Sequence, residues 1–312
     1  MTNFESMEPF KNILVGLDTS ELDITLIEYA SFLVDHTSAE KVQFVNIIRN
    51  LNIPADVKKE FPNLASNAIQ DRKDKIKQAV KEHFSPKKKV KITYLVKQGQ
   101  APMLLDIANK SETDLIVIGQ KKTLDGTGIT TMRLARRASC NLLIIPENAK
   151  PKADKFLVPI DFSDYSKLAL NQTIDFSVKL GGKSEIYCQN VYNVPAGYHY
   201  TGKSFEEFAE IMKQNAQASF KKFMRKIDPR GITIHEKYSL DTNDNLASDI
   251  YDLGDEIGAD VIIIGAKGRT AAAALFLGSL AEKMVNDKMN HPLLVIRFKG
   301  RNAGLLETLR EI

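Results

Sequence analysis

The chain has 312 residues, of which 43% are hydrophobic and 26% charged, a balance that is ordinary for a soluble globular protein and, at this length, predicts two domains. The formal net charge of +4 is too small to require a polyanionic partner, so we expect no binding to nucleic acid. The two cysteines, Cys140 and Cys188, lie far apart without CxxC spacing, which argues against a zinc site or a disulfide framework and favours a reducing compartment.

The opening segment, MTNFESMEPFKNILV, has no basic stretch followed by an apolar run, and no part of the chain is apolar for long enough to cross a bilayer. We therefore expect a cytoplasmic protein with no membrane partner. From Asn12 to Leu33 the sequence predicts an apolar strand, then Asp18, a serine and an amphipathic helix.

The second half of the chain repeats this pattern. The segment from Lys155 to Ser177 again reads as strand, aspartate, serine and helix, with Asp161 in the place of Asp18. TDLIVIGQKK matches ADVIIIGAKG, so Gly119 and Gly265 end corresponding strands, and NLLIIPE matches PLLVIRF. Two copies of this length indicate a duplicated domain rather than a solenoid of short repeats.

The polar segment ENAKPKAD separates the two copies. We expect domain 1 to span residues 1–150 and domain 2 to span residues 151–299. The remaining residues, 300–312, predict a short amphipathic tail helix, because their leucines and the last isoleucine fall on one face.

Strands and helices alternate along each copy. In the second copy the predicted strands are Phe156–Ile160, Glu185–Val191, Ile232–Tyr238, Asp260–Ile264 and Leu293–Phe298. Helical spacing fills the intervals, with one helix capped by Ser163 and others over Ser204–Ile227 and Leu246–Ile257. This alternation predicts an α/β fold of two tandem Rossmann-like domains, each a doubly wound parallel sheet of five strands, with ligands bound beyond the carboxyl ends of the strands.

Three glycines follow the fourth strand of the second copy, in the spacing G-x2-G-x9-G-S. We expect Gly265 and Gly268 to allow positive φ angles and close approach of a ligand, with main-chain N–H groups turned toward an anion. Gly278 and Ser279 precede a predicted helix, whose N-terminus favours phosphate. The loop is neither a GxxxxGK[ST] motif nor a GxGxxG fingerprint, both of which are absent.

This glycine spacing, with Asp161 after the first strand, Val191 at the end of the second and the closing strand PLLVI, resembles the ATP-binding signature of the universal stress protein family. The likeness covers residues 8 to 298, so the chain looks like a tandem member with two adenine nucleotide alpha hydrolase-like domains. In that family the aspartate and the valine contact adenine, and the glycine loop holds the ribose and phosphates.

Carried over to the second copy, the resemblance implies a cofactor-binding site for ATP or another adenine nucleotide. The implied adenine contacts are Pro159, Ile160, Asp161 and Val191, and the implied ribose and phosphate contacts are Gly265, Gly268, Gly278, Ser279 and Leu280. From their positions in the loop, we expect Lys267 and Arg269 to add positive charge near the phosphates. Magnesium is expected to arrive with the nucleotide, because the sequence contains no dedicated carboxylate cage, and no catalytic or metal-ligating residue is assigned.

The first copy departs from the pattern. Lys122 stands where the second glycine is expected, Gly126 and Gly128 do not restore the spacing, and Ile47 replaces the valine. We expect this copy to bind nucleotide weakly or not at all and to serve as the partner surface of the second. In the family the last strands of two domains pair, which implies intramolecular pairing of Leu142–Ile145 with Leu293–Ile296; a homodimer remains open.

Simpler interpretations stay open for several of these residues. Asp18 and Asp161 fit helix caps as well as base contacts, Val191 fits a core residue, and Ser279 fits an N-cap. The basic run from Ser85 to Lys91 lacks interleaved aromatic residues, which favours a solvated edge over a nucleic-acid patch.

The favoured function is a nucleotide-binding stress-response module, regulatory or protective, with little or no catalysis; weak ATP hydrolysis remains open. One alternative is an ATP-using enzyme of the adenine nucleotide alpha hydrolase class. Such enzymes carry an SGGxDS-like loop after the first strand, and the corresponding segment here, VPIDFSDYS, lacks those glycines. The other alternative is a scaffold that binds no nucleotide.

Overall fold

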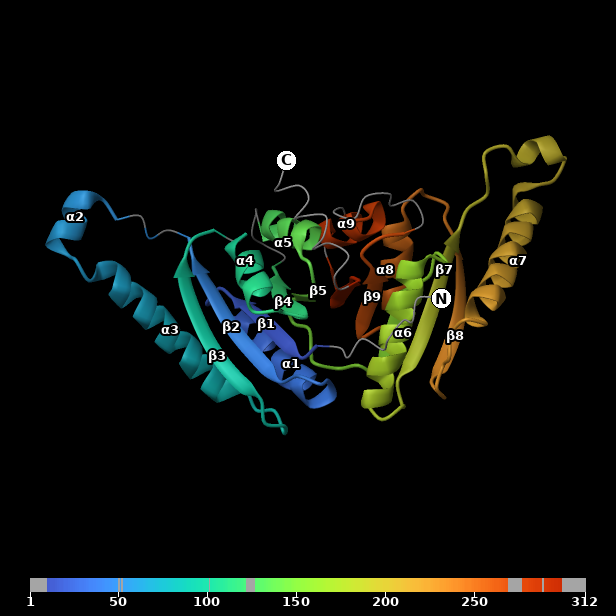
Figure 1. Cartoon of the computed structure of the whole chain (residues 1–312). Coiled ribbons are helices and arrows are strands. Elements are labelled where there is room, and N and C mark those ends of the chain that lie inside the picture. The colour runs from blue at the N-terminus through green and yellow to red at the C-terminus, as the bar shows by residue number, and fades with distance from the viewer. Residues whose placement is uncertain are drawn as a thin grey trace, which may run out of the picture. The chain divides into compact units, whose positions relative to one another are not determined.

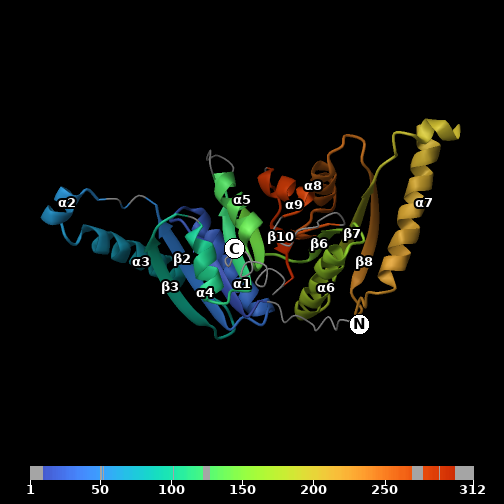
Figure 2. The ribbon, with the colours of Figure 1, turned by 45° about the horizontal axis from the view of Figure 1, so that its top comes forward.

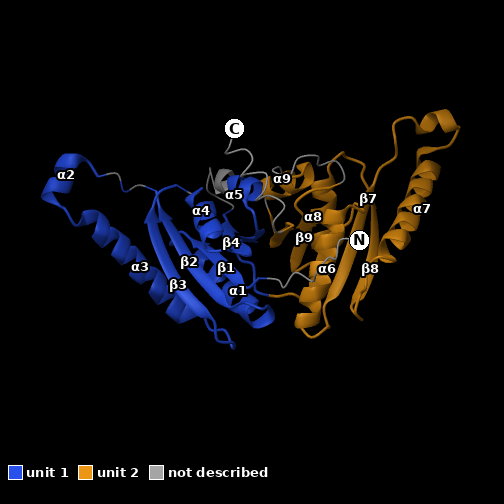
Figure 3. Cartoon of the chain, viewed as in Figure 1, with its two compact units in different colours: residues 1–151 blue, residues 152–312 orange. Residues whose placement is uncertain are grey.

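The chain forms two compact units, Met1–Pro151 (unit 1) and Lys152–Ile312 (unit 2), in the computed structural model (Figure 3). The structure describes residues 10–49, 51, 53–100, 102–121, 127–268, 277–287 and 289–298. The tail helix expected over residues 300–312 therefore lies outside the described residues.

Unit 1 alternates strands and helices and contains a five-stranded sheet of order β3-β2-β1-β4-β5, with parallel pairings (Figure 1). Its elements are β1 (Asn12–Leu17), α1 (Leu22–His36), β2 (Lys41–Ile48), α2 (Ala55–Glu60), α3 (Leu64–His83), β3 (Lys91–Gln98), α4 (Met103–Lys110), β4 (Leu115–Gln120), α5 (Thr127–Arg137) and β5 (Asn141–Pro146).

Unit 2 repeats this arrangement with the strand order β10-β9-β6-β7-β8, again with parallel pairings. Its elements are β6 (Lys155–Pro159), α6 (Asp164–Lys179), β7 (Glu185–Tyr192), a 3-10 turn η1 (Tyr198–Thr201), α7 (Phe205–Met224), β8 (Thr233–Leu240), α8 (Leu246–Ile257), β9 (Val261–Gly265), α9 (Ser279–Asn286) and β10 (Leu293–Ile296). The expected Rossmann-like α/β fold is confirmed.

Helices cover both faces of the sheet in unit 2. Side chains along β9 alternate between the faces. A Cβ built on Gly265 would lie 2.7 Å from the Cβ of Tyr165 in α6, and one built on Gly254 of α8 would lie 3.4 Å from Ile262. The helices α6 and α8 therefore lie on opposite faces, while α7 runs beside β8 in both views (Figure 1 and Figure 2).

The central strands are buried on both faces, as parallel strands between two helical layers must be. Ile262, Ile263 and Ile264 of β9 are each no more than 2% exposed, which agrees with the continuous apolar run in their sequence. No helix in the described ranges has the length and apolar character needed to span a bilayer.

The strand order places a topological switch point between β6 and β9. The chain runs outward from β6 through β7 to β8 and then returns to β9 on the other side of β6. In sheets of this kind the two crossover helices diverge at the switch point, and this leaves a crevice beyond the carboxyl ends of the strands. The segments that follow β6, β7 and β9 therefore meet at one end of the sheet.

Candidate functional site

The turn after β6 is fixed by the Asp161 carboxylate. Its Oδ1 accepts hydrogen bonds from the main-chain N of Ser163 at 3.0 Å and from the Ser163 hydroxyl at 2.6 Å. The Ser163 hydroxyl also caps α6 by accepting from the N of Ser166 at 3.2 Å. Ser163, and not Asp161, is thus the helix cap, while Asp161 forms an Asx turn that holds its carboxylate at the end of the strand.

The residue after the aspartate has the left-handed conformation in both units. Phe162 has φ 66° and Thr19 has φ 65°. Neither residue is glycine, asparagine or aspartate, so each turn carries strain of roughly 1–2 kcal/mol. The ring of Phe162 packs against the ring of Phe223 in α7, with centroids 5.8 Å apart.

An asparagine side chain ties the end of the first strand to the second strand in each unit. The Nδ2 of Asn190 donates to the carbonyl of Ile160 at 2.7 Å, and the Nδ2 of Asn46 donates to the carbonyl of Leu17 at 2.8 Å. Both asparagines are buried. Each bond satisfies a carbonyl at the end of the first strand, and the bond in unit 2 fixes the backbone of Ile160 at the crevice.

The three loop glycines are required for close packing rather than for unusual backbone angles. None of Gly265, Gly268 and Gly278 has a left-handed φ, so the expectation of positive φ at Gly265 and Gly268 is wrong. A Cβ on Gly268 would lie 2.7 Å from Oδ2 of Asp161, and one on Gly278 would lie 3.2 Å from the Cα of Lys267. Gly265 and Gly278 therefore lie close to main-chain atoms that cannot turn aside, whereas the close neighbour of Gly268 is the end of a side chain.

The N-terminus of α9 opens toward the same region. Gly278 is its N-cap residue and donates its N–H to the carbonyl of Ala266 at 2.8 Å, while the first N–H bonded within the helix is that of Glu282, to the carbonyl of Gly278 at 2.9 Å. The amides of Ser279, Leu280 and Ala281 precede that bond. Free amides at the start of a helix carry partial positive charge and suit phosphate oxygens.

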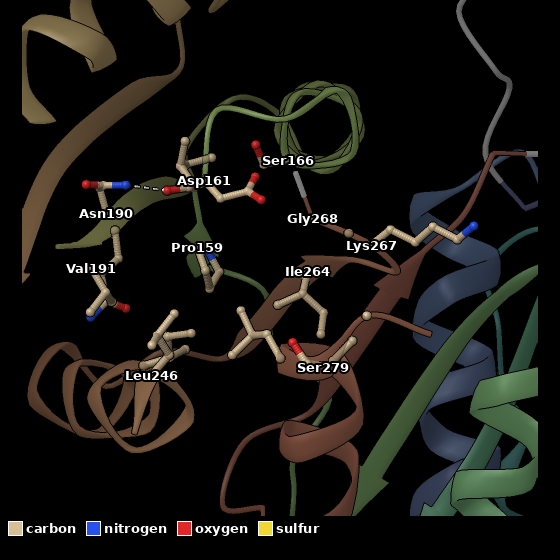
Figure 4. Close-up of a pocket in the computed structure, with 17 residues that line it drawn as sticks. Pro159, Asp161, Ser166, Asn190, Val191, Leu246, Ile264, Lys267, Gly268 and Ser279 are labelled. Atoms are coloured by element: carbon tan, nitrogen blue, oxygen red, sulfur yellow. Dashed lines mark hydrogen bonds between the residues drawn. The ribbon is translucent and has the colours of Figure 1, made fainter. Parts of the chain in front are cut away.

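These segments enclose a cavity of ≈ 270 Å³ at the carboxyl end of the unit 2 sheet (Figure 4). Ten of the eleven expected site residues line it, and Arg269 lies outside the described residues. The lining contains Pro159, Ile160, Asp161, Val191, Gly265, Lys267, Gly268, Gly278, Ser279 and Leu280, together with Ser166, Gln189, Asn190, Leu246, Ile250, Ile264 and Ala281.

The Lys267 side chain does not point into this cavity. Figure 4 shows it extending away from Asp161 and Ser279. Its Nζ lies 6.0 Å from the centre of the Tyr165 ring. Burial, reinforced by the nearby Arg297, lowers the pKa of Lys267 below its ordinary value. The residue thus contributes main-chain atoms to the lining, and its ammonium is not at the place expected from sequence.

Seven lining residues were not anticipated as site residues. Two of them, Leu246 and Ile250, belong to the predicted apolar stripe of α8, which gives no sign of whether that stripe faces a cavity or the core. A signal for Asn190 does exist, because both copies carry asparagine immediately before the valine or isoleucine at the end of the second strand. Gln189 interrupts an apolar strand and is itself fully buried.

In unit 1 the aspartate after the first strand is paired with a lysine from the end of the fourth strand. Asp18 pairs with Lys121 through Oδ2 and Nζ at 2.5 Å. Burial of Asp18 opposes ionisation, but the hydrogen bonds from Lys121 and Ser20 together with the charge of Lys121 outweigh it, so the pKa of Asp18 is lowered. Lys122 and Gly126, on which the expectation of weak binding rests, lie outside the described residues.

A second carboxylate, from Asp23, takes the position that Ser166 has in unit 2. Its oxygens accept from the amides of Asp18 at 3.0 Å and of Thr19 at 2.7 Å. Burial raises the pKa of Asp23 to about 6, because the loss of hydration outweighs these two hydrogen bonds. The first turn of unit 1 is therefore closed by its own side chains.

Among the described residues, His, Cys, Asp and Glu side chains form no group of three or more that suits a metal ion. The one thiol close to the site, Cys188, is fully buried within β7, and burial raises its pKa. A raised thiol pKa disfavours the nucleophilic thiolate.

Comparison with known proteins gives a consistent assignment. The model of the universal stress protein family matches residues 9–146 and again residues 152–297. The chain is 27% identical over 155 residues to universal stress protein MJ0531 of Methanocaldococcus jannaschii, covering 49% of this chain and 87% of that protein. It is 24% identical over 159 residues to universal stress protein MJ0577 of the same organism, covering 47% of this chain and 96% of that protein.

Structural comparison agrees at the level of the fold. A universal stress protein from Archaeoglobus fulgidus has a TM-score of 0.62 and 17% identity, covering 93% of this chain and 99% of that one. Because the family model matches nearly the whole chain in two successive stretches, this chain belongs to the universal stress protein family and carries two of its domains in tandem.

Proposed function

We propose that unit 2 binds an adenine nucleotide, in particular ATP, and that the chain is a nucleotide-responsive stress module with little or no catalysis. One observation carries the proposal. Segments far apart in the sequence, after β6, β7 and β9 and at the start of α9, meet around one cavity and supply most of the residues of the nucleotide signature.

The residues fit the two ends of such a ligand. Val191 lies at one side of the cavity and Ser279 at the other, and the Asp161 carboxylate lies between them, beside Gly268 (Figure 4). The amides at the start of α9 suit phosphate, and side chains at Gly268 or Gly278 would fill the space that a phosphate chain needs. Phosphate oxygens would supply ligands for an accompanying Mg²⁺.

The decisive measurement is calorimetry with ATP on the wild type and on Gly268→Lys. We expect binding to the wild type and none to the variant, because the added side chain meets Asp161 and fills the loop. A matched control is Gly197→Lys. Gly197 is exposed, has φ −84° and would bring its Cβ no closer than 3.7 Å to Tyr200, so the control adds the same charge outside the cavity.

Equal binding by the wild type and Gly268→Lys would refute the assignment of the glycine loop, and absence of binding by both would refute nucleotide binding altogether. Mass spectrometry of small molecules released when the purified protein is denatured gives an independent answer. An adenine nucleotide in equimolar amount would support the proposal. Rapid turnover of ATP by the wild type would contradict the part of it that excludes strong catalysis.

A further inference from the structure

Gln189 is a buried amide in the lining of the candidate nucleotide cavity. It lies in β7, two residues before Val191, and its side chain is fully buried. Residues two apart on a strand point to the same face, so Gln189 lies on the face that Val191 presents. At the corresponding position unit 1 has Val45, immediately before Asn46.

The Gln189 side chain joins three elements. Its Nε2 donates to the hydroxyl of Ser239 in β8 at 2.9 Å and to the main-chain carbonyl of Asp249 in α8 at 2.8 Å. This one amide therefore fixes α8 against β7 and β8. From α8, the side chains of Leu246 and Ile250 form part of the cavity lining.

This anchor carries a stability penalty. The Oε1 of Gln189 is buried and has no hydrogen-bond partner in the described part of the chain. A buried acceptor without a partner destabilises a protein by roughly 1–3 kcal/mol, whereas an apolar residue of similar shape avoids that penalty. Unit 1 has the apolar residue Val45 at this position and avoids the penalty, so a strand of this fold does not need glutamine here.

We propose that Gln189 is a positioning residue for ligand binding in unit 2, which holds the Leu246 and Ile250 wall of α8 against the base end of the nucleotide. The inference rests on the proposed function. In Figure 4, Leu246 lies on the Val191 side of the cavity, and Gly268 and Ser279 lie on the opposite side. Loosening α8 therefore weakens contacts to the base and leaves contacts to the phosphates in place.

The test substitutes Gln189→Leu, which keeps the size of the side chain and removes both donated bonds. Binding of ATP and AMP is measured by calorimetry, and unfolding by urea titration. We expect both ligands to bind roughly tenfold more weakly, by analogy with the loss of metal affinity when a hydrogen bond that orients a metal ligand is removed. The weakening factor should be equal for ATP and AMP, because both ligands share the base.

The matched control is Gln172→Leu in α6. Gln172 is also buried, at 6% exposure, and its Oε1 also lacks a partner among the described residues, but it does not line the cavity. We expect Gln172→Leu to bind ATP and AMP like the wild type. The urea midpoints of the two variants should lie close together, so a loss of affinity confined to Gln189→Leu cannot arise from general destabilisation.

The outcomes separate this inference from the proposed function. If the wild type binds neither ligand, both are overturned. If the wild type binds and Gln189→Leu binds equally well, the positioning role is overturned and the nucleotide site remains. A weakening that is much larger for ATP than for AMP would place the effect at the phosphates and also overturn the inference.

Discussion

Gly265 and Gly268 belong to one motif, yet their surroundings predict opposite consequences for a single added methyl group. In Gly265→Ala the new Cβ would lie 2.7 Å from the Cβ of Tyr165 and 2.9 Å from its main-chain carbonyl atoms. Main-chain atoms of a helix cannot turn aside, so strand and helix must separate. In Gly268→Ala the close neighbour, at 2.7 Å, is Oδ2 of Asp161, the end of a side chain that can rotate.

Overpacking of this kind costs about 1–3 kcal/mol. We therefore expect Gly265→Ala to lower the free energy of unfolding of unit 2 by that amount, with a fall in Tm of roughly 2–4 °C for each kcal/mol. Gly268→Ala has a backbone angle that alanine tolerates, so its stability should remain within about 0.5 kcal/mol of the wild type. Because it displaces Asp161 inside the cavity, it should weaken ATP binding.

Urea unfolding followed by circular dichroism gives the stabilities, and calorimetry gives the affinities. Gly197→Ala is the control, since its Cβ would meet Tyr200 at an ordinary 3.7 Å. The reasoning is refuted if Gly265→Ala unfolds together with the control, or if Gly268→Ala proves the less stable of the two motif variants.

Three further predictions follow from charge and burial. The pKa of Asp23 is raised from 3.8 to about 6, so the folded state holds a proton that the unfolded chain releases, and stability should fall by about 2 kcal/mol as pH rises from 4 to 6. Asp23→Asn should flatten this slope in urea titrations. Lys267→Met should change ATP affinity by no more than about twofold, because the ammonium points away from the cavity. Asn190→Leu leaves the Ile160 carbonyl without its donor and should destabilise unit 2 by about 1–3 kcal/mol.

Each of these predictions has a result that contradicts it. A pH slope that is the same for the wild type and Asp23→Asn would mean that Asp23 titrates normally. A tenfold loss of ATP affinity in Lys267→Met, measured by calorimetry, would instead support the contact between Lys267 and the phosphates that was expected from sequence. Wild-type stability of Asn190→Leu in urea would mean that the Ile160 carbonyl finds water instead.

The sequence predicted the duplicated α/β fold because strand and helix periodicities are local properties, and they occur independently in each of the two copies. The glycine spacing after the fourth strand and Asp161 after the first strand predicted the place of the candidate site, because few other kinds of loop have this spacing between a strand and a helix. The direction of the Lys267 side chain was not predictable in the same way, since spacing fixes where a backbone lies and not where a long side chain extends. The role of Gln189 was not predictable from sequence, because it depends on a hydrogen bond to the Asp249 carbonyl in α8, which is distant in the sequence.

Unit 1 illustrates the same limit. Asp23 follows the turn in a segment that reads as ordinary helix, yet it folds back onto the amides of Asp18 and Thr19. The contact occurs at a turn where Thr19 has a left-handed backbone. Threonine rarely adopts that conformation, so the sequence does not predict it.

The left-handed turn after the first strand also bears on how each half of the chain can change. Thr19→Gly would relieve strain in unit 1 and forfeit only the polar contacts of one hydroxyl, to the Asp18 carbonyl and to Arg72. Phe162→Gly would relieve similar strain but would remove a ring packed on Phe223. The strain of this turn can thus be removed from the first copy by one substitution that costs little packing, whereas in the second copy the same relief would cost an aromatic contact.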